Sequence, residues 1–290
     1  MILKAIVIVA SALAARTAAH GIVSEFYTDG DRNAGFQTEY IYRKQSGNPV
    51  PDLAAWSTES LDRGYIEPNN LQTLHINCHV NAEPGVLTAQ VAAGGKVDFF
   101  WPDWPHNVGP VLTYIVACTG DCLQTSPLLG QKLMDNNFTW TTTVPENIAA
   151  GNYVFRNEII NLHSGAELNG AQLYPQCVNI EITGSGTETP EGVLGISLYK
   201  ADDPGILFDP YGKTIDYPLP GPALYSSPGS TVSPAPIGSV TTGHTTIAPT
   251  GTPAIEISGH PSASFTAPRT RSRSNPGSRT RTSGPCPSDV

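Results

Sequence analysis

The sequence contains little positive charge. Between His20 and Tyr225, nine lysines and arginines stand against twenty-three aspartates and glutamates, a net charge of −14 with histidine neutral. A field of this sign repels phosphate-rich partners, so nucleic acids and anionic membranes are poor candidates as ligands. A neutral polymer such as a polysaccharide is not excluded on these grounds.

The chain also lacks a hydrophobic segment long enough to cross a membrane. Lys4 precedes the apolar run Ala5–Ala10, and small residues follow as far as Ala19. A membrane anchor needs about 20 apolar residues, so this run is too short for one. The pattern instead predicts a secretory signal peptide over residues 1–19. We expect a secreted, extracellular protein that begins at His20.

Cysteines are few, and their number is odd. In an oxidising compartment pairing is the default, and free thiols are the alternative. Cys118 and Cys122 are close enough in sequence to close a small loop. Cys78 and Cys177 are then left as a long-range pair, and Cys286 has no obvious partner.

Aromatic residues nearly disappear after Tyr225. Residues 226–290 are dominated by Ser, Thr, Pro and Gly, and Phe265 is their single aromatic. Such a composition cannot bury enough apolar surface to form a core, which predicts a disordered tail. The basic run near its end is interpreted as solvated.

No long helical period is present in residues 20–225. Short apolar or alternating runs recur there instead, separated by Gly, Pro, Asn and Asp, as in the segments PVLTYIVAC, FTWTTTVP, GNYVFRNEII and QCVNIEIT. This pattern is typical of an all-β protein. We predict one domain, an immunoglobulin/fibronectin-like antiparallel β-sandwich with long loops and short helical pieces.

Several side chains could form a metal site. A histidine at a mature N-terminus offers both an amine and an imidazole nitrogen, donors that suit Cu(II), and His20 would be such a residue. His106 stands in a loop fixed by prolines and a glycine, and His163 follows an apparent strand. Gln172 and Tyr174 are two residues apart, so on a strand they would face the same side. Taken singly, each of these residues could equally be structural.

Together these segments resemble Auxiliary Activity family 9, formerly glycoside hydrolase family 61. The matching stretches keep the family's order over nearly the whole predicted domain: NPVPDLAAWST, QTLHINCH, PGVLTAQVAAGG, WPHNVGPVLTYIVACTGDC, IAAGNYVFRNEIINLHSG, NGAQLYPQCVNIEITGSGT, DDPGIL and YPLPGP. The resemblance implies a secreted fungal lytic polysaccharide monooxygenase.

The resemblance also implies a copper site. His20 would supply its amino group and Nδ1, His106 its Nε2, and Tyr174 a distant axial position. His163 and Gln172 match the pair that the family uses to steer the oxygen species. One copper ion, an external reductant and O₂ or H₂O₂ would then support hydroxylation at C1, C4 or both.

The expected partners follow from the same resemblance. They are the surface of cellulose or another β-glucan, and an electron donor such as a small phenol, ascorbate or a secreted dehydrogenase. Tyr217 matches an exposed aromatic that stacks on glucose rings. The resemblance implies the disulfides Cys78–Cys177 and Cys118–Cys122. We expect a monomer that interacts with neither nucleic acid nor membrane.

The sequence departs from the family's usual pattern beside His106. The family has His-x-Gly-Pro, but here both Asn107 and Val108 precede Gly109. Either the loop absorbs one residue and His106 is the ligand, or the position belongs to Asn107 and the copper site is broken. We favour His106 because it directly follows Trp104-Pro105.

Three further features complete the sequence prediction. The segment 123–137 is short for the family, and Asn157 stands where the family commonly has the histidine of Arg-His-Glu. Asn137 begins an Asn-Phe-Thr sequon and is a predicted glycosylation site.

Because a fold does not fix a function, the alternative is a non-catalytic secreted protein that binds carbohydrate or copper on the same fold.

Overall fold

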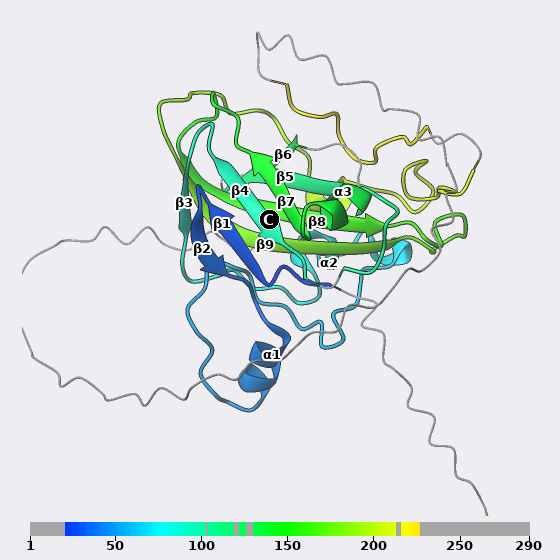
Figure 1. Cartoon of the computed structure of the whole chain (residues 1–290), viewed down its shortest axis with the longest axis horizontal. Helices are drawn as coiled ribbons and strands as arrows, with labels where there is room; N and C mark the ends of the chain where they lie inside the picture. Colours follow the sequence, from blue (N-terminus) through cyan, green and yellow to red (C-terminus); the bar gives the residue numbers. More distant parts are fainter. Residues whose placement is uncertain (1–20, 103, 119–121, 126–129, 213–215, 227–290) are drawn as a thin grey trace, which may run out of the picture.

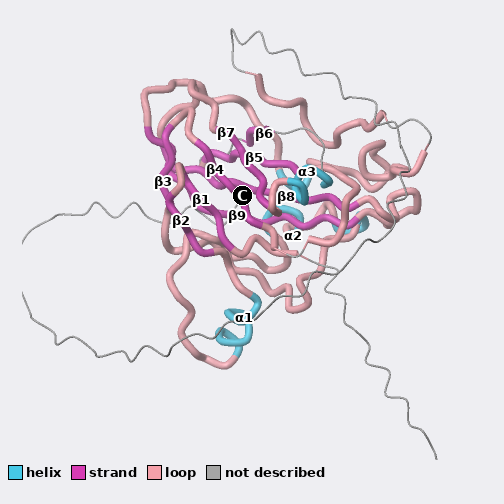
Figure 2. The backbone as a smooth tube through the Cα atoms, in the orientation of Figure 1, coloured by secondary structure: helices cyan, strands magenta, loops and turns pink. Residues whose placement is uncertain are grey.

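The structure is a computed structural model that describes residues 21–102, 104–118, 122–125, 130–212 and 216–226. Two β-sheets pack face to face, and loops cover much of the surface (Figures 1 and 2). The first sheet has the strand order β2-β1-β4-β7, and the second has the order β3-β9-β8-β5-β6. The predicted β-sandwich is confirmed.

The strands are short except for the β8–β9 pair. Their bounds are β1 Glu25–Thr28, β2 Asp31–Ala34, β3 Ala89–Ala92, β4 Lys96–Phe100, β5 Val111–Ala117, β6 Cys122–Thr125, β7 Thr139–Thr143, β8 Gly151–Asn161 and β9 Gln172–Thr183. The helical pieces are α1 Thr38–Gln45, η1 Pro68–Asn70, α2 His75–Cys78, α3 Gly130–Asp135 and η2 Gly195–Ser197. Every named strand pair is antiparallel except β3 with β9, which run parallel.

The five-stranded sheet is buried on both faces, and β5 shows why. Its apolar residues are nearly continuous, so alternate side chains enter different cores. Val111 and Ile115 face the core between the sheets, whereas Leu112 and Tyr114 face a second core on the outer side. The second core is closed by loop segments, α2 and η2.

A disulfide between Cys78 and Cys177 fixes α2 to β9. Cys118 also forms a disulfide. The side chain of Cys122 lies outside those that the structure describes, so the pairing of these two residues stays a prediction. Cys286 is likewise outside the described residues.

A buried ion pair lies within β8, and its arginine also bonds to the backbone of α2. The guanidinium of Arg156 donates to both carboxylate oxygens of Glu158, at 2.9 and 2.6 Å, and to the backbone oxygen of Ile76. Tyr199 donates its hydroxyl to Glu158 at 2.6 Å. Burial disfavours the charged guanidinium, but the attraction of Glu158 outweighs it and raises the pKa of Arg156. The guanidinium of Arg156 therefore stays charged inside the outer core.

Some of the predicted features lie outside the described residues. The signal peptide, His20 and the tail from residue 227 onward are among them. Across the part of the chain that is described, no helix is long and apolar enough to cross a membrane. Asn137 is exposed in the turn before β7 with φ of 50°, and its glycosylation stays a prediction.

Candidate metal centre

The candidate site lies at one end of the sandwich, where β8 ends, β9 begins and a loop enters β5. Backbone hydrogen bonds fasten this loop to the end of β8: the N–H of Leu162 donates to Val108 at 3.2 Å, and that of Ile160 to Pro110 at 3.0 Å. Gly109 lies between these two bonds with φ of +118°. The loop that carries His106 is therefore held against the segment that carries His163.

The structure brings His106 and His163 together. Their rings stack with centroids 4.9 Å apart and planes 2° from parallel. On another side, the ring of His106 meets the indole of Trp104 edge to face at 5.5 Å. His106 is partly exposed and His163 is exposed, whereas Trp104 is buried. The two imidazoles thus form a surface layer above an aromatic floor.

Tyr174 belongs to that floor. Its buried ring packs edge to face against Trp104, with centroids 4.9 Å apart, and its hydroxyl donates to the Oε1 atom of Gln172 at 3.0 Å. The prediction that Gln172 and Tyr174 face the same side of a strand is confirmed. Burial raises the pKa of the Tyr174 phenol, so this group stays protonated and donates.

Asn161 is a site residue that the sequence analysis missed. It is fully buried, and its Nδ2 atom lies 2.6 Å from Nδ1 of His163 and 2.8 Å from Oε1 of Gln172. The sequence signal was weak, because a lone asparagine at the end of an apolar strand usually marks a turn. Only the β8–β9 register, which pairs Asn161 with Gln172, brings these three residues together.

The floor of the site extends back toward the N-terminus. Trp101 packs edge to face on Trp104 at 5.9 Å, and its indole N–H donates to the buried Asn157 at 2.7 Å. A β-carbon at Gly21 would lie 2.7 Å from Trp104. Gly21 therefore contacts the indole that supports His106, and the residue bonded to it, His20, lies outside the described residues.

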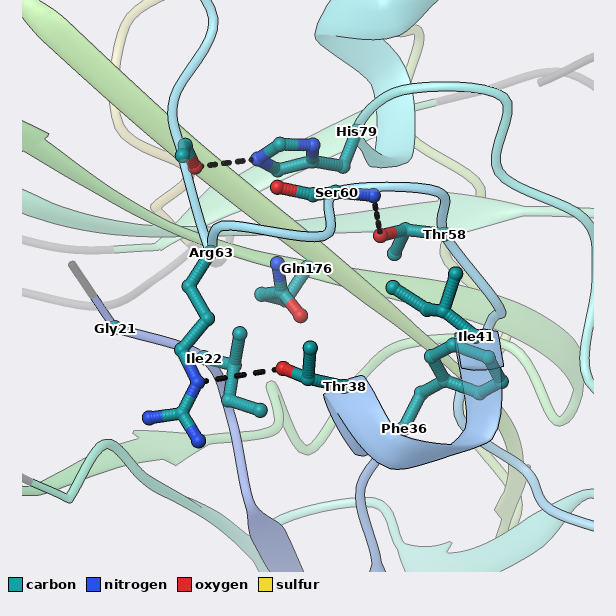
Figure 3. A pocket seen from close by; sticks show the side chains of 11 residues that line it. Gly21, Ile22, Phe36, Thr38, Ile41, Thr58, Ser60, Arg63, His79 and Gln176 are labelled. Carbon is teal, nitrogen blue, oxygen red and sulfur yellow. Dashed lines mark hydrogen bonds between the residues drawn. The ribbon is translucent and has the colours of Figure 1, made fainter. Parts of the chain in front are cut away.

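Gly21 also lines a small pocket (Figure 3). Its lining includes Thr38 of α1, Arg63 of the loop before α2, and the buried His79, which directly follows α2. The Nε2 atom of His79 lies 2.9 Å from the backbone oxygen of Gly64. The backbone N–H of Val80 donates to its Nδ1 atom, also at 2.9 Å. His79 is thus a packed structural residue.

The prediction that Tyr217 is an exposed aromatic is wrong. Tyr217 is only 2% exposed, its ring packs edge to face on Phe208, and its hydroxyl donates to the backbone oxygen of Gly205 at 2.6 Å. The aromatic that this segment exposes is Tyr211, at 66%. Tyr217 is buried in the second core, on the outer face of the five-stranded sheet. A sequence pattern that assumes one buried sheet face does not predict this core.

Tyr211 lies on a segment that is anchored beside the site. The backbone N–H of Phe208 donates to the oxygen of Gly165 at 2.8 Å, and Gly165 follows His163 by two residues. The backbone N–H of Tyr211 donates a hydrogen bond to the Oδ1 atom of Asp209 at 2.9 Å. The resemblance pointed to a tyrosine of this segment, but the exposed tyrosine is Tyr211 and not Tyr217.

The described side chains include candidate ligands for the predicted copper site. Imidazole nitrogen is a preferred donor for Cu(II), and His106 could provide one. The rings of His106 and Tyr174 both pack against Trp104. Within the described residues, no three His, Cys, Asp or Glu side chains meet as a metal site. The predicted copper ligands also include the α-amine and the imidazole of His20, which lies outside the described residues. The contact of Gly21 with Trp104 is compatible with that set.

Comparisons with known proteins give a consistent result. The model of Auxiliary Activity family 9 (formerly GH61) matches residues 20–129 and 124–217. The AA9 family lytic polysaccharide monooxygenase D of Botryotinia fuckeliana is 46% identical over 226 residues, covering 71% of this chain and 92% of that protein. The AA9 family lytic polysaccharide monooxygenase A of Malbranchea cinnamomea is 45% identical over 241 residues, covering 75% of this chain and 71% of that protein.

Solved structures agree with these relatives. The glycoside hydrolase family 61 member Cel61B from Hypocrea jecorina has a TM-score of 0.68 at 40% identity, covering 71% of this chain and 100% of that one. The extended catalytic domain of LPMO9A from H. jecorina has a TM-score of 0.67 at 35% identity, covering 74% and 94% respectively. The similarity thus extends over all or nearly all of each solved chain.

Proposed function

This chain belongs to Auxiliary Activity family 9, and from that premise we propose that it acts on cellulose or a related β-glucan with one copper ion held by His20, His106 and Tyr174. As a lytic polysaccharide monooxygenase, it cleaves polysaccharides oxidatively. Its products would be hydroxylated at C1, C4 or both. The electrons would come from a small phenol, ascorbate or a secreted dehydrogenase, with O₂ or H₂O₂ as co-substrate.

The observation that carries the copper proposal is the position of His106. Although two residues separate it from Gly109, its ring rests on Trp104 and faces His163, while Asn107 is exposed. We infer that the loop absorbs the extra residue and that the imidazole keeps its place in the site. This arrangement supports His106 rather than Asn107 as the ligand.

The donor set suits copper. Two imidazoles and an amine supply nitrogen donors for Cu(II), whereas the side chain of Asn107 would offer only a weak amide oxygen. A copper ion bound there would supply one-electron redox chemistry to the oxygen co-substrate. Tyr174 would contribute its hydroxyl as a neutral phenol, consistent with its raised pKa.

The protein's own contribution is positioning. His163 is exposed beside His106 and is held by Asn161, so it can donate a hydrogen bond to a molecule at the site. Gln172 is fixed from below by Tyr174. We assign His163 and Gln172 to orienting the oxygen co-substrate, a role whose loss typically costs about 10- to 100-fold.

The proposal includes the path by which the protein reaches its substrate. Residues 1–19 would direct secretion and be removed, residues 20–225 would form the enzyme, and residues 226–290 would be an extension dispensable for copper binding. The enzyme would act as an extracellular monomer. An extra residue before His20 would acylate its α-amine and remove one donor, so such a form should bind copper poorly.

Two matched variants test the assignment. His106→Ala should lose tight copper binding and the release of oxidised oligosaccharides together, because one nitrogen donor is gone. Asn107→Ala should retain both. The measurements are copper titration and mass spectrometry of the products from amorphous cellulose with ascorbate as reductant. Unchanged copper affinity in His106→Ala would refute the ligand assignment, and absence of copper binding by the parent protein would refute the proposal itself.

A further inference from the structure

Asn161 occupies the last position of β8, opposite the first residue of β9. Its β-ladder partner is Gln172, and its side chain is 0% exposed. Three polar groups surround it: the backbone N–H and the Nδ1 atom of His163, and the Oε1 atom of Gln172. A buried amide with three partners has its orientation determined by what each partner can do.

The backbone of His163 fixes the Asn161 amide. A backbone N–H can only donate, and it lies 3.1 Å from the Asn161 side chain, so the atom facing it is Oδ1. The NH₂ group of Asn161 must then point toward His163 Nδ1 and Gln172 Oε1. The reverse orientation would place one donor against another in a buried position, which costs about 1–3 kcal/mol.

The fixed amide in turn determines the proton position on His163. Nδ1 faces an N–H donor at 2.6 Å and must act as an acceptor. A neutral imidazole has one donor nitrogen and one acceptor nitrogen, so the proton resides on Nε2. His163 therefore presents a donor on the side of its ring away from Asn161.

The same amide orients Gln172. Its Oε1 atom accepts from Asn161 at 2.8 Å and from the Tyr174 hydroxyl at 3.0 Å. With the oxygen turned inward against two donors, the NH₂ group of Gln172 points the other way. Both side chains that border the site thus have their acceptors satisfied from beneath and their donors directed outward.

We propose that Asn161 is a positioning residue that sets the Nε2–H tautomer of His163 and the amide orientation of Gln172, so that both groups offer donors to the oxygen co-substrate. This inference rests on the proposed function in taking the oxygen co-substrate as the acceptor. Preorganised donors stabilise negative charge where it develops, whereas a bare imidazole nitrogen or a carbonyl oxygen there would repel it. Asn161 itself touches neither reactant.

The tautomer can be measured without copper. In metal-free protein labelled with ¹⁵N, long-range ¹H–¹⁵N correlations of the imidazole distinguish a protonated from an unprotonated nitrogen. At a pH where His163 is neutral, the parent should show a protonated Nε2 and a bare Nδ1. Asn161→Asp keeps the acceptor for the backbone N–H but removes the donor, so the proton should move to Nδ1.

Functional readouts separate positioning from binding. Asn161→Asp should leave copper affinity within about twofold while turnover on cellulose falls at least about 10-fold. Asn169→Asp is the matched control, because it places the same charge at an exposed position of the β8–β9 connection and should preserve both the tautomer and turnover. If Asn161→Asp fails to fold, Asn161→Ala should show a mixture of tautomers.

The outcomes distinguish this inference from the proposed function. A protonated Nδ1 in the parent, or the same tautomer in parent and Asn161→Asp, would overturn the role of Asn161 even if the enzyme binds copper and releases oxidised products. Conversely, a parent that shows the expected tautomer but binds no copper would leave the hydrogen-bond network intact and remove its proposed purpose.

Discussion

A β-carbon at Gly109 would lie 1.8 Å from the backbone oxygen of Ile160. No such contact can exist, so the loop that presents His106 can approach β8 this closely only with glycine at this position. The φ of Gly109, +118°, is also outside the range that other residues readily adopt. The position of His106 thus depends on a residue that has no side chain.

Gly109→Ala should therefore displace the loop and damage the copper site. We expect the free energy of unfolding to fall by about 2 kcal/mol or more, and copper affinity to fall with it. Urea denaturation and copper titration measure the two effects. Gly30→Ala is the matched control, because Gly30 has φ of +94° but no neighbour within 4 Å of an added β-carbon. Equal losses in both variants would show that the approach to Ile160 is unimportant.

Part of the site could be predicted from the sequence because its geometry is local. Gln172 and Tyr174 share a face through the two-residue period of a strand, and no other information is needed. The identity of the second histidine could be favoured but not decided, because a loop's accommodation of Asn107 depends on its contacts with β8. The stacking of His106 on His163 supports the assignment of His106 as the ligand, which stays a prediction.

Other parts could not be predicted, because they depend on contacts distant in sequence. Asn161 comes next to Gln172 through the register of β8 with β9. Trp101 is held beneath the site by a hydrogen bond to Asn157. Tyr217 was assigned to the surface by motif position, but the second core on the outer sheet face buries it. A resemblance transfers the order of segments more reliably than the exposure of a side chain.

Tyr211 is the exposed aromatic of the segment docked beside His163. An exposed ring can stack on glucose, so Tyr211→Ala should weaken binding to cellulose about threefold to tenfold, equivalent to ~0.5–1.5 kcal/mol. A pull-down isotherm on microcrystalline cellulose measures this change. Tyr217→Phe is the control, because it removes a buried hydroxyl that bonds Gly205 and should lower stability without altering binding. Unchanged affinity in Tyr211→Ala would exclude a stacking role.

The buried His79 should make stability depend on pH. Burial lowers the pKa of this imidazole from 6.5 to about 4, opposed by its hydrogen bond to Gly64 and the charge of Asp62, and reinforced by His75. The unfolded chain therefore binds the proton more readily than the folded protein between these two values. The contribution of neutral His79 to the free energy of unfolding is therefore complete above pH 6.5. It declines as the pH falls toward about 4, by up to about 3 kcal/mol in total.

Comparing the parent with His79→Gln isolates this contribution from the many carboxylates that titrate in the same range. Glutamine cannot take up a proton there, so the free energy of unfolding of the variant should depend less steeply on pH between 6.5 and about 4. Denaturant titrations across this window give the two slopes. The variant should be less stable than the parent above pH 6.5, because the bonds to Gly64 and Val80 are disturbed, and the difference should narrow as the solution is acidified. Parallel pH profiles for the two proteins would mean that His79 titrates in the folded state much as it does in the unfolded chain, despite its burial beneath the pocket that borders Gly21.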